Sequence, residues 1–425
     1  MRFMAISYTG FEKILRLTNL SIQLTVMRAL LIILFSLTVL CAGAQKITLS
    51  TRVQDKVTSE PLPFASVGIK GKSISTVTNL QGEFDFHIPL EYRNEILVIS
   101  MLGYENFEAP IWSLLESKPE SIGMDKSTTV LKEVVVSDSL LGGEIVKIAL
   151  SRVENNFPMK PFLMDGFYRD VKKVAGTSIS LLEAAVKIYD ENYMEPRNKS
   201  KLRERVKLVE VRKSLGYDNR YTPFFRQRNL LEDLLLHNNI RYRQIDDDEG
   251  FFSSLKREPD SYYNGQNIFV VSNTEDFYFK IFISKDNYAI NRLEFEISGD
   301  NTERKKNLVS KQVTYRKTID FKPFDGKMFL NYITVTTKEK WYDDVTAAFK
   351  FETELQQYLL INEVNPETQD RITDKMRNYG LQFQDYPYNK EFWDDYNVIK
   401  ETPIDKKILE DLERLAPLEK QFENN

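Results

Sequence analysis

The fold of the N-terminal region is decided by the stretch Glu60-Pro61-Leu62-Pro63-Phe64-Ala65-Ser66-Val67, which is followed by Ser75-Thr76-Val77-Thr78-Asn79 and by Gly82-Glu83-Phe84-Asp85-Phe86. Short alternating runs of apolar and polar residues, separated by Gly, Pro and Asn, predict a small antiparallel β-sandwich. Asn79 and Gly82 frame a tight turn, because both residue types tolerate positive φ at low cost. Further pieces follow at Leu97-Val98-Ile99-Ser100 and Gly103-Tyr104.

The order of these pieces resembles the carboxypeptidase-regulatory-like domain, a transthyretin-like fold common in envelope proteins of Bacteroidota. The resemblance implies a non-catalytic module, which we place at residues 45–136. Residues 127–136, Ser-Thr-Thr-Val-Leu-Lys-Glu-Val-Val-Val, look like the connector that follows this domain in TonB-dependent outer-membrane transporters. The alternative, which we favour, is that residues 134–136 form the last strand of the sandwich.

The N-terminus predicts export. Arg28 precedes an apolar run over residues 29–40, which is too short to span a bilayer comfortably. The spacing Ala42-x-Ala44 is the small-x-small pattern that signal peptidase reads, so we expect cleavage directly after it. Residues 1–44 are therefore a signal region, and we expect the true start at Met27.

Cysteine usage and charge fit an exported protein. The chain has one cysteine, Cys41, and a lipid anchor on it is the alternative to simple cleavage. Leu40 stands where a lipid-anchor signal needs Gly, Ala or Ser, so we favour cleavage. With 58 basic and 62 acidic residues, the net charge is −4. This mildly acidic balance argues against nucleic acid as a partner.

The region 137–365 alternates between helix and strand patterns and predicts an α+β domain with a curved antiparallel sheet. Apolar residues at helical spacing predict helices at residues 143–156 and 230–237. Asp325-Gly326 predicts a tight hairpin turn. Strands are predicted at residues 162–169, 178–189, 206–211, 267–271, 277–284, 289–297, 312–321, 328–338 and 348–362.

Two further resemblances concern this second region. The block 278–337 resembles in pattern the curved half-barrel of periplasmic lipoprotein-carrier proteins. The order of segments after Gly143, with Asp165-Gly166-Phe167-Tyr168-Arg169 and Glu183-Ala184, is similar to an uncharacterised C-terminal region of Bacteroidota envelope proteins. That resemblance implies no activity. Residues 366–425 form a helical and aromatic tail, which we expect to pack on the second domain.

Few residues are suited to metal chemistry. A catalytic zinc needs three protein ligands and a water, and the chain has only His87 and His237. They fall in different predicted domains, so we expect no zinc, no cofactor and no catalytic residues. Asp246 and Asp248, in a run that ends at Gly250, are a candidate pair for Ca²⁺. A solvated turn is the alternative that we favour there.

Aromatic residues are the candidates for contacts with a ligand or partner. The chain has 27 Phe, 21 Tyr and 3 Trp residues. Trp341-Tyr342 and Phe392-Trp393 could line a ligand groove, although most aromatic side chains fill cores.

We therefore predict a mainly β, α+β protein. It has an N-terminal transthyretin/immunoglobulin-like β-sandwich and a larger antiparallel domain with a half-barrel sheet. The leading hypothesis is a non-catalytic, exported binding or scaffolding protein of the periplasm or outer membrane, peripheral to the membrane. Its expected partner is another envelope protein, or an apolar or glycan ligand.

Two alternatives stay open. A lipid or lipoprotein carrier should show a long apolar cavity, whereas a scaffold should show a filled core and an exposed patch. A hydrolase would need paired carboxylates, and the spatial pairing of carboxylates is not visible in a sequence.

Overall fold

The computed structural model describes residue 27 and residues 46–127, 140–218, 220–225, 230–245, 248–273, 277–299, 303–373, 380–384, 386–400 and 403–423. The chain divides into two compact units: Met1–Ile47 with Ile88–Arg93, and Thr48–His87 with Asn94–Asn425. In the first unit, the described residues include a 3₁₀ helix, η2 (Leu90–Tyr92). The expected signal region, its cleavage site, Cys41 and the strand at 134–136 lie outside the described residues. The features below belong to the second unit, apart from the ends of β1 and β4.

The N-terminal sandwich consists of two small sheets, with strand orders β4-β1-β7 and β3-β2-β5-β6. Strands β1 and β7 pair in parallel, so the expected antiparallel pairing is wrong for these two strands. Parallel neighbours need a crossover connection, and the chain between β1 and β7, which includes helix α2, supplies it. The elements are β1 (Lys46–Asp55), β2 (Ser66–Ile69), β3 (Ser75–Val77), β4 (Glu83–Pro89), β5 (Ile96–Ser100), β6 (Phe107–Pro110), α2 (Ile111–Ser117) and β7 (Ile122–Met124).

The turn that leads into β4 forms as predicted. Gly82 has φ +73°, and a Cβ atom built there would lie 2.2 Å from the carbonyl oxygen of Val53. The Asn79 side chain accepts hydrogen bonds from the backbone N–H groups of Gln81 and Glu83. The position therefore requires glycine both for its backbone angle and for the space it leaves.

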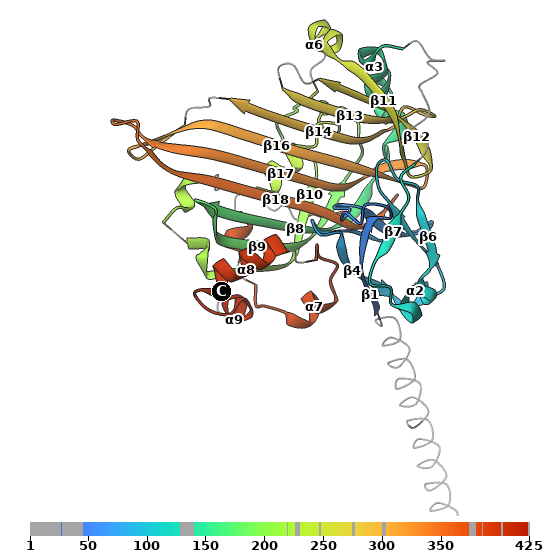
Figure 1. The fold of residues 1–425 in the computed structure, drawn as a ribbon, viewed down its shortest axis with the longest axis horizontal. Coiled ribbons are helices and arrows are strands. Elements are labelled where there is room, and N and C mark those ends of the chain that lie inside the picture. The colour runs from blue at the N-terminus through green and yellow to red at the C-terminus, as the bar shows by residue number, and fades with distance from the viewer. Residues whose placement is uncertain are drawn as a thin grey trace, which may run out of the picture. The chain divides into compact units, whose positions relative to one another are not determined.

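A large antiparallel sheet follows the sandwich (Figure 1). Among the described residues it has 11 strands, in the order β10-β9-β8-β18-β17-β16-β14-β13-β12-β11, with β15 on β16. The strands are β8 (Phe162–Val174), β9 (Thr177–Asp190), β10 (Arg205–Lys213), β11 (Lys256–Tyr263), β12 (Gln266–Asn273), β13 (Tyr278–Ser284), β14 (Ile290–Gly299), β15 (Arg304–Lys305), β16 (Leu308–Phe324), β17 (Lys327–Asp343) and β18 (Phe349–Asn365).

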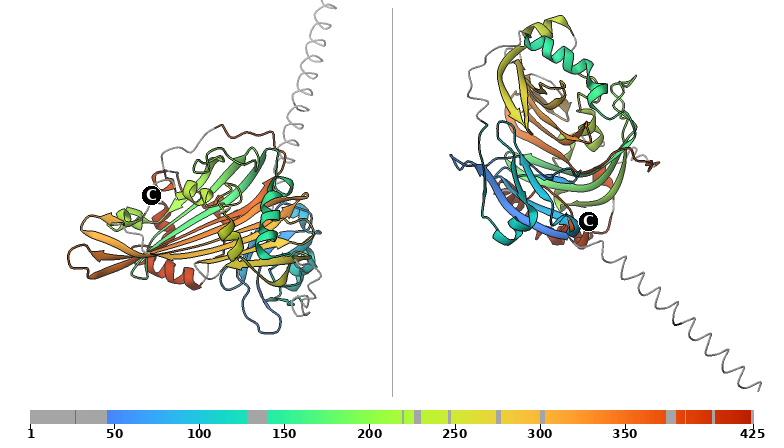
Figure 2. Two further views of the ribbon diagram at one scale, coloured as in Figure 1. Left: turned by 90° about the horizontal axis from the view of Figure 1, so that it is seen from above. Right: turned by 90° about the vertical axis from the view of Figure 1, so that its right-hand side faces the viewer.

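The sheet curves but stays open, because its end strands β10 and β11 do not pair with each other (Figure 2). The predicted fold class, a β-sandwich followed by a larger α+β domain, is confirmed. Strand β11 was not predicted, because its sequence is polar and contains Pro259. Proline is tolerated at sheet edges and bulges, and here it lies at the register shift between Glu258 and Ser261 of an edge strand.

The two faces of the sheet are covered by different parts of the chain. The core face, which carries Ile333 and Leu359, packs against helices α3 (Gly142–Ser151) and α5 (Leu230–Leu236). The opposite face carries Phe167 and Leu360. Strand β18 there contacts β3 of the sandwich, and helices α8 (Pro403–Glu413) and α9 (Leu418–Glu423) contact β9 and β10.

The remaining helical segments are α4 (Val153–Asn156), η4 (Leu215–Asp218), η5 (Thr222–Phe224), α6 (Glu249–Ser254), η6 (Leu381–Phe383) and α7 (Lys390–Asp395). None of the helices in the described ranges is both long enough and apolar enough to cross a membrane.

Candidate ligand cavity

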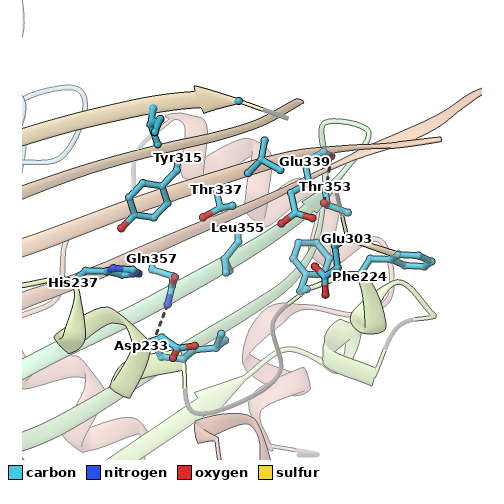
Figure 3. A pocket seen from close by; sticks show the side chains of 15 residues that line it. Phe224, Asp233, His237, Glu303, Tyr315, Thr337, Glu339, Thr353, Leu355 and Gln357 are labelled. Atoms are coloured by element: carbon cyan, nitrogen blue, oxygen red, sulfur yellow. Dashed lines mark hydrogen bonds between the residues drawn. The ribbon is translucent and has the colours of Figure 1, made fainter. Parts of the chain in front are cut away.

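A cavity of about 390 Å³ opens on the core face of the sheet, between the strands and helix α5 (Figure 3). We call it cavity A. Val335 is the last residue of strand β17 in the main apolar core, and the cavity begins beyond it. The described residues that line it are Phe224, Phe225, Leu230, Asp233, His237, Ile297, Gly299, Glu303, Val313, Tyr315, Thr337, Glu339, Thr353, Leu355 and Gln357.

The strand register builds the floor of cavity A. Thr337 on β17 lies opposite Tyr315 on β16 and opposite Leu355 on β18. Ile297 on β14 continues the row, because it pairs with Tyr315. Residues directly opposite in neighbouring strands point to the same face, so this row forms one continuous surface. In Figure 3 the labelled members of the row point into the same space.

Helix α5 and the residue after it form the facing wall. The Gln357 amide donates a hydrogen bond of 3.0 Å to the carbonyl oxygen of Leu230, which ties the start of α5 to the floor. Asp233 and His237 are four residues apart and therefore lie on one side of the helical turn, toward the strands (Figure 3). The His237 ring centroid is 5.2 Å from that of Tyr315.

The polar groups of cavity A include three carboxylates, which accept hydrogen bonds. Glu303 and Glu339 contribute carboxylates at the end of the cavity away from His237 (Figure 3). Glu303 also pairs with Lys305 at 3.1 Å. Thr353 accepts a hydrogen bond of 2.9 Å from the Trp341 indole N–H, so its hydroxyl already has a partner within the protein. The lining therefore combines an apolar and aromatic surface with a few convergent polar groups, as small-molecule sites do.

A buried lysine lies beside the cavity wall. The Lys317 ammonium is 5.8 Å from the Tyr315 ring centroid and 5.3 Å from that of Phe295, and it donates to the Asn239 side-chain oxygen. Burial lowers the pKa of Lys317 to about 8. The aromatic faces and the amide oxygen stabilise its charged form only in part.

The aromatic residues singled out from the sequence fall on separate parts of the molecule. Trp341 is fully buried and packs edge-on against Phe224, at 5.0 Å, so it supports the wall of cavity A from behind. Tyr342 packs against Phe349. On the opposite face of the sheet, Phe392 and Trp393 form an aromatic cluster with Phe167 and Tyr396. Their role as ligand contacts stays a prediction.

Among the candidate metal ligands, Asp248 and His87 make hydrogen bonds, and His237 packs against an aromatic ring. Asp248 caps helix α6 by accepting a hydrogen bond from the Phe251 N–H at 2.8 Å, whereas Asp246 lies outside the described residues. His87 is 2.8 Å from the Thr48 hydroxyl, and His237 lines cavity A. Over the described ranges, no group of three or more His, Cys, Asp or Glu side chains is placed to hold a metal ion.

The residues of cavity A could not be recognised as one site from the sequence. One signal was present: Thr337 and Glu339 follow Ile333 and Val335 at alternate positions of β17. A face that changes from apolar to polar within one strand marks the end of a packed core. The position of α5 opposite that point could not be read from the sequence.

Comparisons with known proteins bear on the N-terminal region. The CarboxypepD_reg-like domain family matches residues 49–136, which supports the resemblance stated for this part of the chain. Over 95 residues the chain is 33% identical to the TonB-dependent receptor SusC of Bacteroides thetaiotaomicron, a match that covers 22% of this chain and 9% of SusC. The chain thus matches only a small part of this relative.

Solved structures give only faint likenesses. A lipovitellin structure, on lipid-protein interactions, is 10% identical with a TM-score of 0.24 and covers 58% of this chain and 29% of that chain. A structure of MucB in complex with MucA(peri) is 10% identical with a TM-score of 0.17. It covers 53% of this chain and 99% of that chain. These scores are too low to bear on fold or function.

Proposed function

We propose that this chain is a non-catalytic, exported binding protein of the cell envelope, which holds a small ligand in cavity A. The CarboxypepD_reg-like domain and the partial identity to SusC support envelope association, together with the leader pattern at residues 1–44. Its partner is another envelope protein, and the sandwich is the module that docks to this partner.

Cavity A is the observation that carries this proposal. Its volume of about 390 Å³ falls within the range of roughly 300–1,000 Å³ that is typical of small-molecule sites. The floor is fixed by the pairing of four neighbouring strands, so the site is held by rigid elements rather than by loops.

The lining favours a ligand with hydroxyl groups and an apolar face, as a glycan has. The rings of Phe224 and Tyr315 offer flat surfaces, and the carboxylates of Asp233, Glu303 and Glu339 are acceptors for hydroxyl donors. An acyl chain in the same place would remove water from these carboxylates and offer them no hydrogen-bond donor in exchange, which costs free energy. This argues for a glycan-like ligand over the lipid of a carrier protein.

The lining also argues against hydrolysis through a hydroxyl nucleophile. Thr337 and Thr353 are the aliphatic hydroxyl side chains among the described lining residues. The Thr353 hydroxyl is occupied by Trp341, and Thr337 projects from the middle of a sheet row whose neighbours are Tyr315 and Leu355. A nucleophile needs a base within hydrogen-bond reach, and the neighbours of Thr337 in that row are not carboxylates or histidines.

Cell fractionation and chemical extraction test the proposal. Wild-type protein should be recovered with the envelope fraction, and mass spectrometry of its extract should show an enriched small molecule. Thr337→Trp should lose that molecule because the new ring fills the cavity. Thr336→Trp, one residue earlier on the other side of the same strand, is the matched control and should retain it. Recovery in the cytoplasmic fraction, or equal enrichment in both variants, would refute the proposal.

A further inference from the structure

Strands β17 and β18 join in a tight turn at one end of the large sheet, which lies at the left in Figure 1 and in the left view of Figure 2. The Asp343 carboxylate accepts hydrogen bonds from the backbone N–H groups of Val345 and Thr346, at 3.2 Å and 2.9 Å. The turn between β15 and β16 lies beside this one, because the Asp344 N–H donates to the Asn307 carbonyl oxygen at 3.1 Å. We call the two turns together, residues 304–311 and 342–350, the sheet tip.

The sheet tip exposes an uncharged and mainly apolar run. Residues 345–349, Val-Thr-Ala-Ala-Phe, are all exposed, with Val345 at 88% and Phe349 at 56%. The Phe349 ring packs against that of Tyr342, with centroids 5.7 Å apart. Hydrogen bonds fix the backbone of the turn, so the run is presented on an ordered support. Contiguous exposed apolar groups with a polar rim are typical of an interaction site.

Two exposed lysines border this run. The Lys306 ammonium lies 5.8 Å from the ring centroid of Phe224, and the Lys311 ammonium lies 5.8 Å from that of Tyr342. Within the described part of the chain, neither lysine forms an ion pair with a carboxylate. Their charges are therefore available to an anionic surface.

The other cations of the sheet tip have carboxylate partners. The pairs are Arg304–Asp344 at 3.6 Å, Lys350–Asp343 at 3.4 Å and Lys305–Glu303 at 3.1 Å. With Glu303 included, the tip holds five cations and three carboxylates, whereas the whole chain has a net charge of −4. The tip is thus locally positive on an acidic chain, and Lys306 and Lys311 carry the excess.

We propose that the sheet tip inserts shallowly into an anionic membrane surface. Val345 and Phe349 lie at the boundary between head groups and acyl chains, where burial of their apolar surface is favourable. Lys306 and Lys311 lie at the level of the lipid phosphates and are attracted by anionic head groups. Tyr342 suits the same level, because aromatic rings with a polar group favour membrane interfaces.

The small size of the tip favours a membrane over a protein partner. Each side of a stable protein interface contributes roughly 20–30 residues, and the apolar run of the tip has five. Shallow anchoring in a membrane needs only a small apolar area together with attraction to anionic lipids. The inference does not depend on the function proposed for cavity A.

Co-sedimentation of the exported chain with lipid vesicles tests the proposal. The chain is used in the form cleaved after Ala44, so that the apolar leader takes no part. One set of vesicles is phosphatidylcholine alone, and in the other about half of the lipid is phosphatidylglycerol. We expect binding to the anionic vesicles to be at least about fivefold stronger than to the neutral ones, and to weaken at high salt. Binding should persist in Thr337→Trp, which fills cavity A.

Val345→Glu places a charge within the apolar run and should reduce binding to anionic vesicles about tenfold or more. Val57→Glu is the matched control, because it makes the same change at a valine that is also 88% exposed, and it should bind as the wild type does. Lys306→Gln/Lys311→Gln should remove most of the preference for anionic vesicles. All these side chains are exposed, so thermal unfolding of each variant should match that of the wild type.

Three results would overturn the proposal. The first is a wild-type chain that stays in the supernatant with both kinds of vesicle. If that chain also dimerises, and Val345→Glu does not, the tip is a contact between copies instead. The second result is equal sedimentation of Val345→Glu and Val57→Glu, which would place the membrane contact elsewhere. The third is equal binding to neutral and anionic vesicles, which would mean that the lysines play no part.

Discussion

The ring of Phe64, in the N-terminal sandwich, stacks on the ring of Tyr332, in strand β17 of the large sheet, with centroids 5.5 Å apart. Val77 of the sandwich is buried in the same apolar cluster. The Lys322 ammonium donates to the Ser73 carbonyl oxygen, at 3.3 Å, and to the Ser75 hydroxyl. The sandwich is thus packed onto the sheet by apolar and polar contacts together.

Phe64→Ala should destabilise the whole chain and not only the sandwich. Loss of a half-buried aromatic contact is expected to lower the free energy of unfolding by about 2 kcal/mol. Urea denaturation of the full chain measures this. Val57→Ala, at a sandwich residue that is 88% exposed, is the control and should change little. Equal stability of both variants would show that the contact contributes nothing.

Gly82→Ala should cost more stability than Gly71→Ala. Both glycines have φ +73°, so both substitutions carry the strain of a left-handed alanine, about 1–2 kcal/mol. At Gly82 the new Cβ would also meet the Val53 carbonyl oxygen, whereas at Gly71 nothing lies within 4 Å. Thermal unfolding should place Gly82→Ala below Gly71→Ala. The reverse order would contradict the turn geometry.

A buried carboxyl should make stability depend on pH. Burial, and then the charge of Asp190, raise the pKa of Glu204 to about 7. The folded chain therefore keeps a proton that the unfolded chain releases near its usual pKa of about 4.3. This contribution is complete below the unfolded pKa and is lost as the pH rises through 7.

Glu204→Gln should flatten the stability profile between pH 5 and pH 8. Relative to that variant, the wild type should lose on the order of 2 kcal/mol across the interval. Chemical denaturation at a series of pH values measures the difference. Glu249→Gln, at a side chain that is 83% exposed, is the control and should follow the wild type. Parallel profiles of wild type and Glu204→Gln would rule out a titrating Glu204.

Purified protein should contain no stoichiometric zinc. His87 is hydrogen-bonded to Thr48, and His237 faces Tyr315 in cavity A. The two imidazoles therefore have different neighbours and do not share a metal site. Metal analysis checks this directly. One zinc per chain that is lost in His87→Ala/His237→Ala would support the hydrolase alternative. Because His237 lines cavity A, His87→Ala alone is the variant expected to leave ligand binding unchanged.

The strands of the large sheet could be predicted from sequence where their apolar faces are buried, but their full lengths could not. Strand β16 was predicted over residues 312–321 and extends over Leu308–Phe324. Its added ends include Lys311 and Lys322, which interrupt the apolar alternation. Backbone pairing with β17 continues through these polar residues, because a hydrogen-bonded ladder does not require apolar side chains.

Cavity A and the charged row across strands β8, β9 and β10 could not be predicted, because each depends on three-dimensional register. The row Arg169, Glu183 and Arg212 forms only with the bulge in β10, and a shift of one residue would turn Arg212 to the other face. Cavity A needs helix α5 to end opposite the polar half of β17. Trp341 was one of four candidate ligand contacts, and its full burial could not be read from the sequence.

Native mass spectrometry of the chain, isolated from its own envelope without denaturation, tests the central claim most directly. If cavity A holds a ligand, the wild-type mass should exceed that of the bare chain by one small molecule. Thr337→Trp should show the bare mass, and Thr336→Trp should keep the addition. A bare wild-type chain, or an addition that survives Thr337→Trp, would contradict the account.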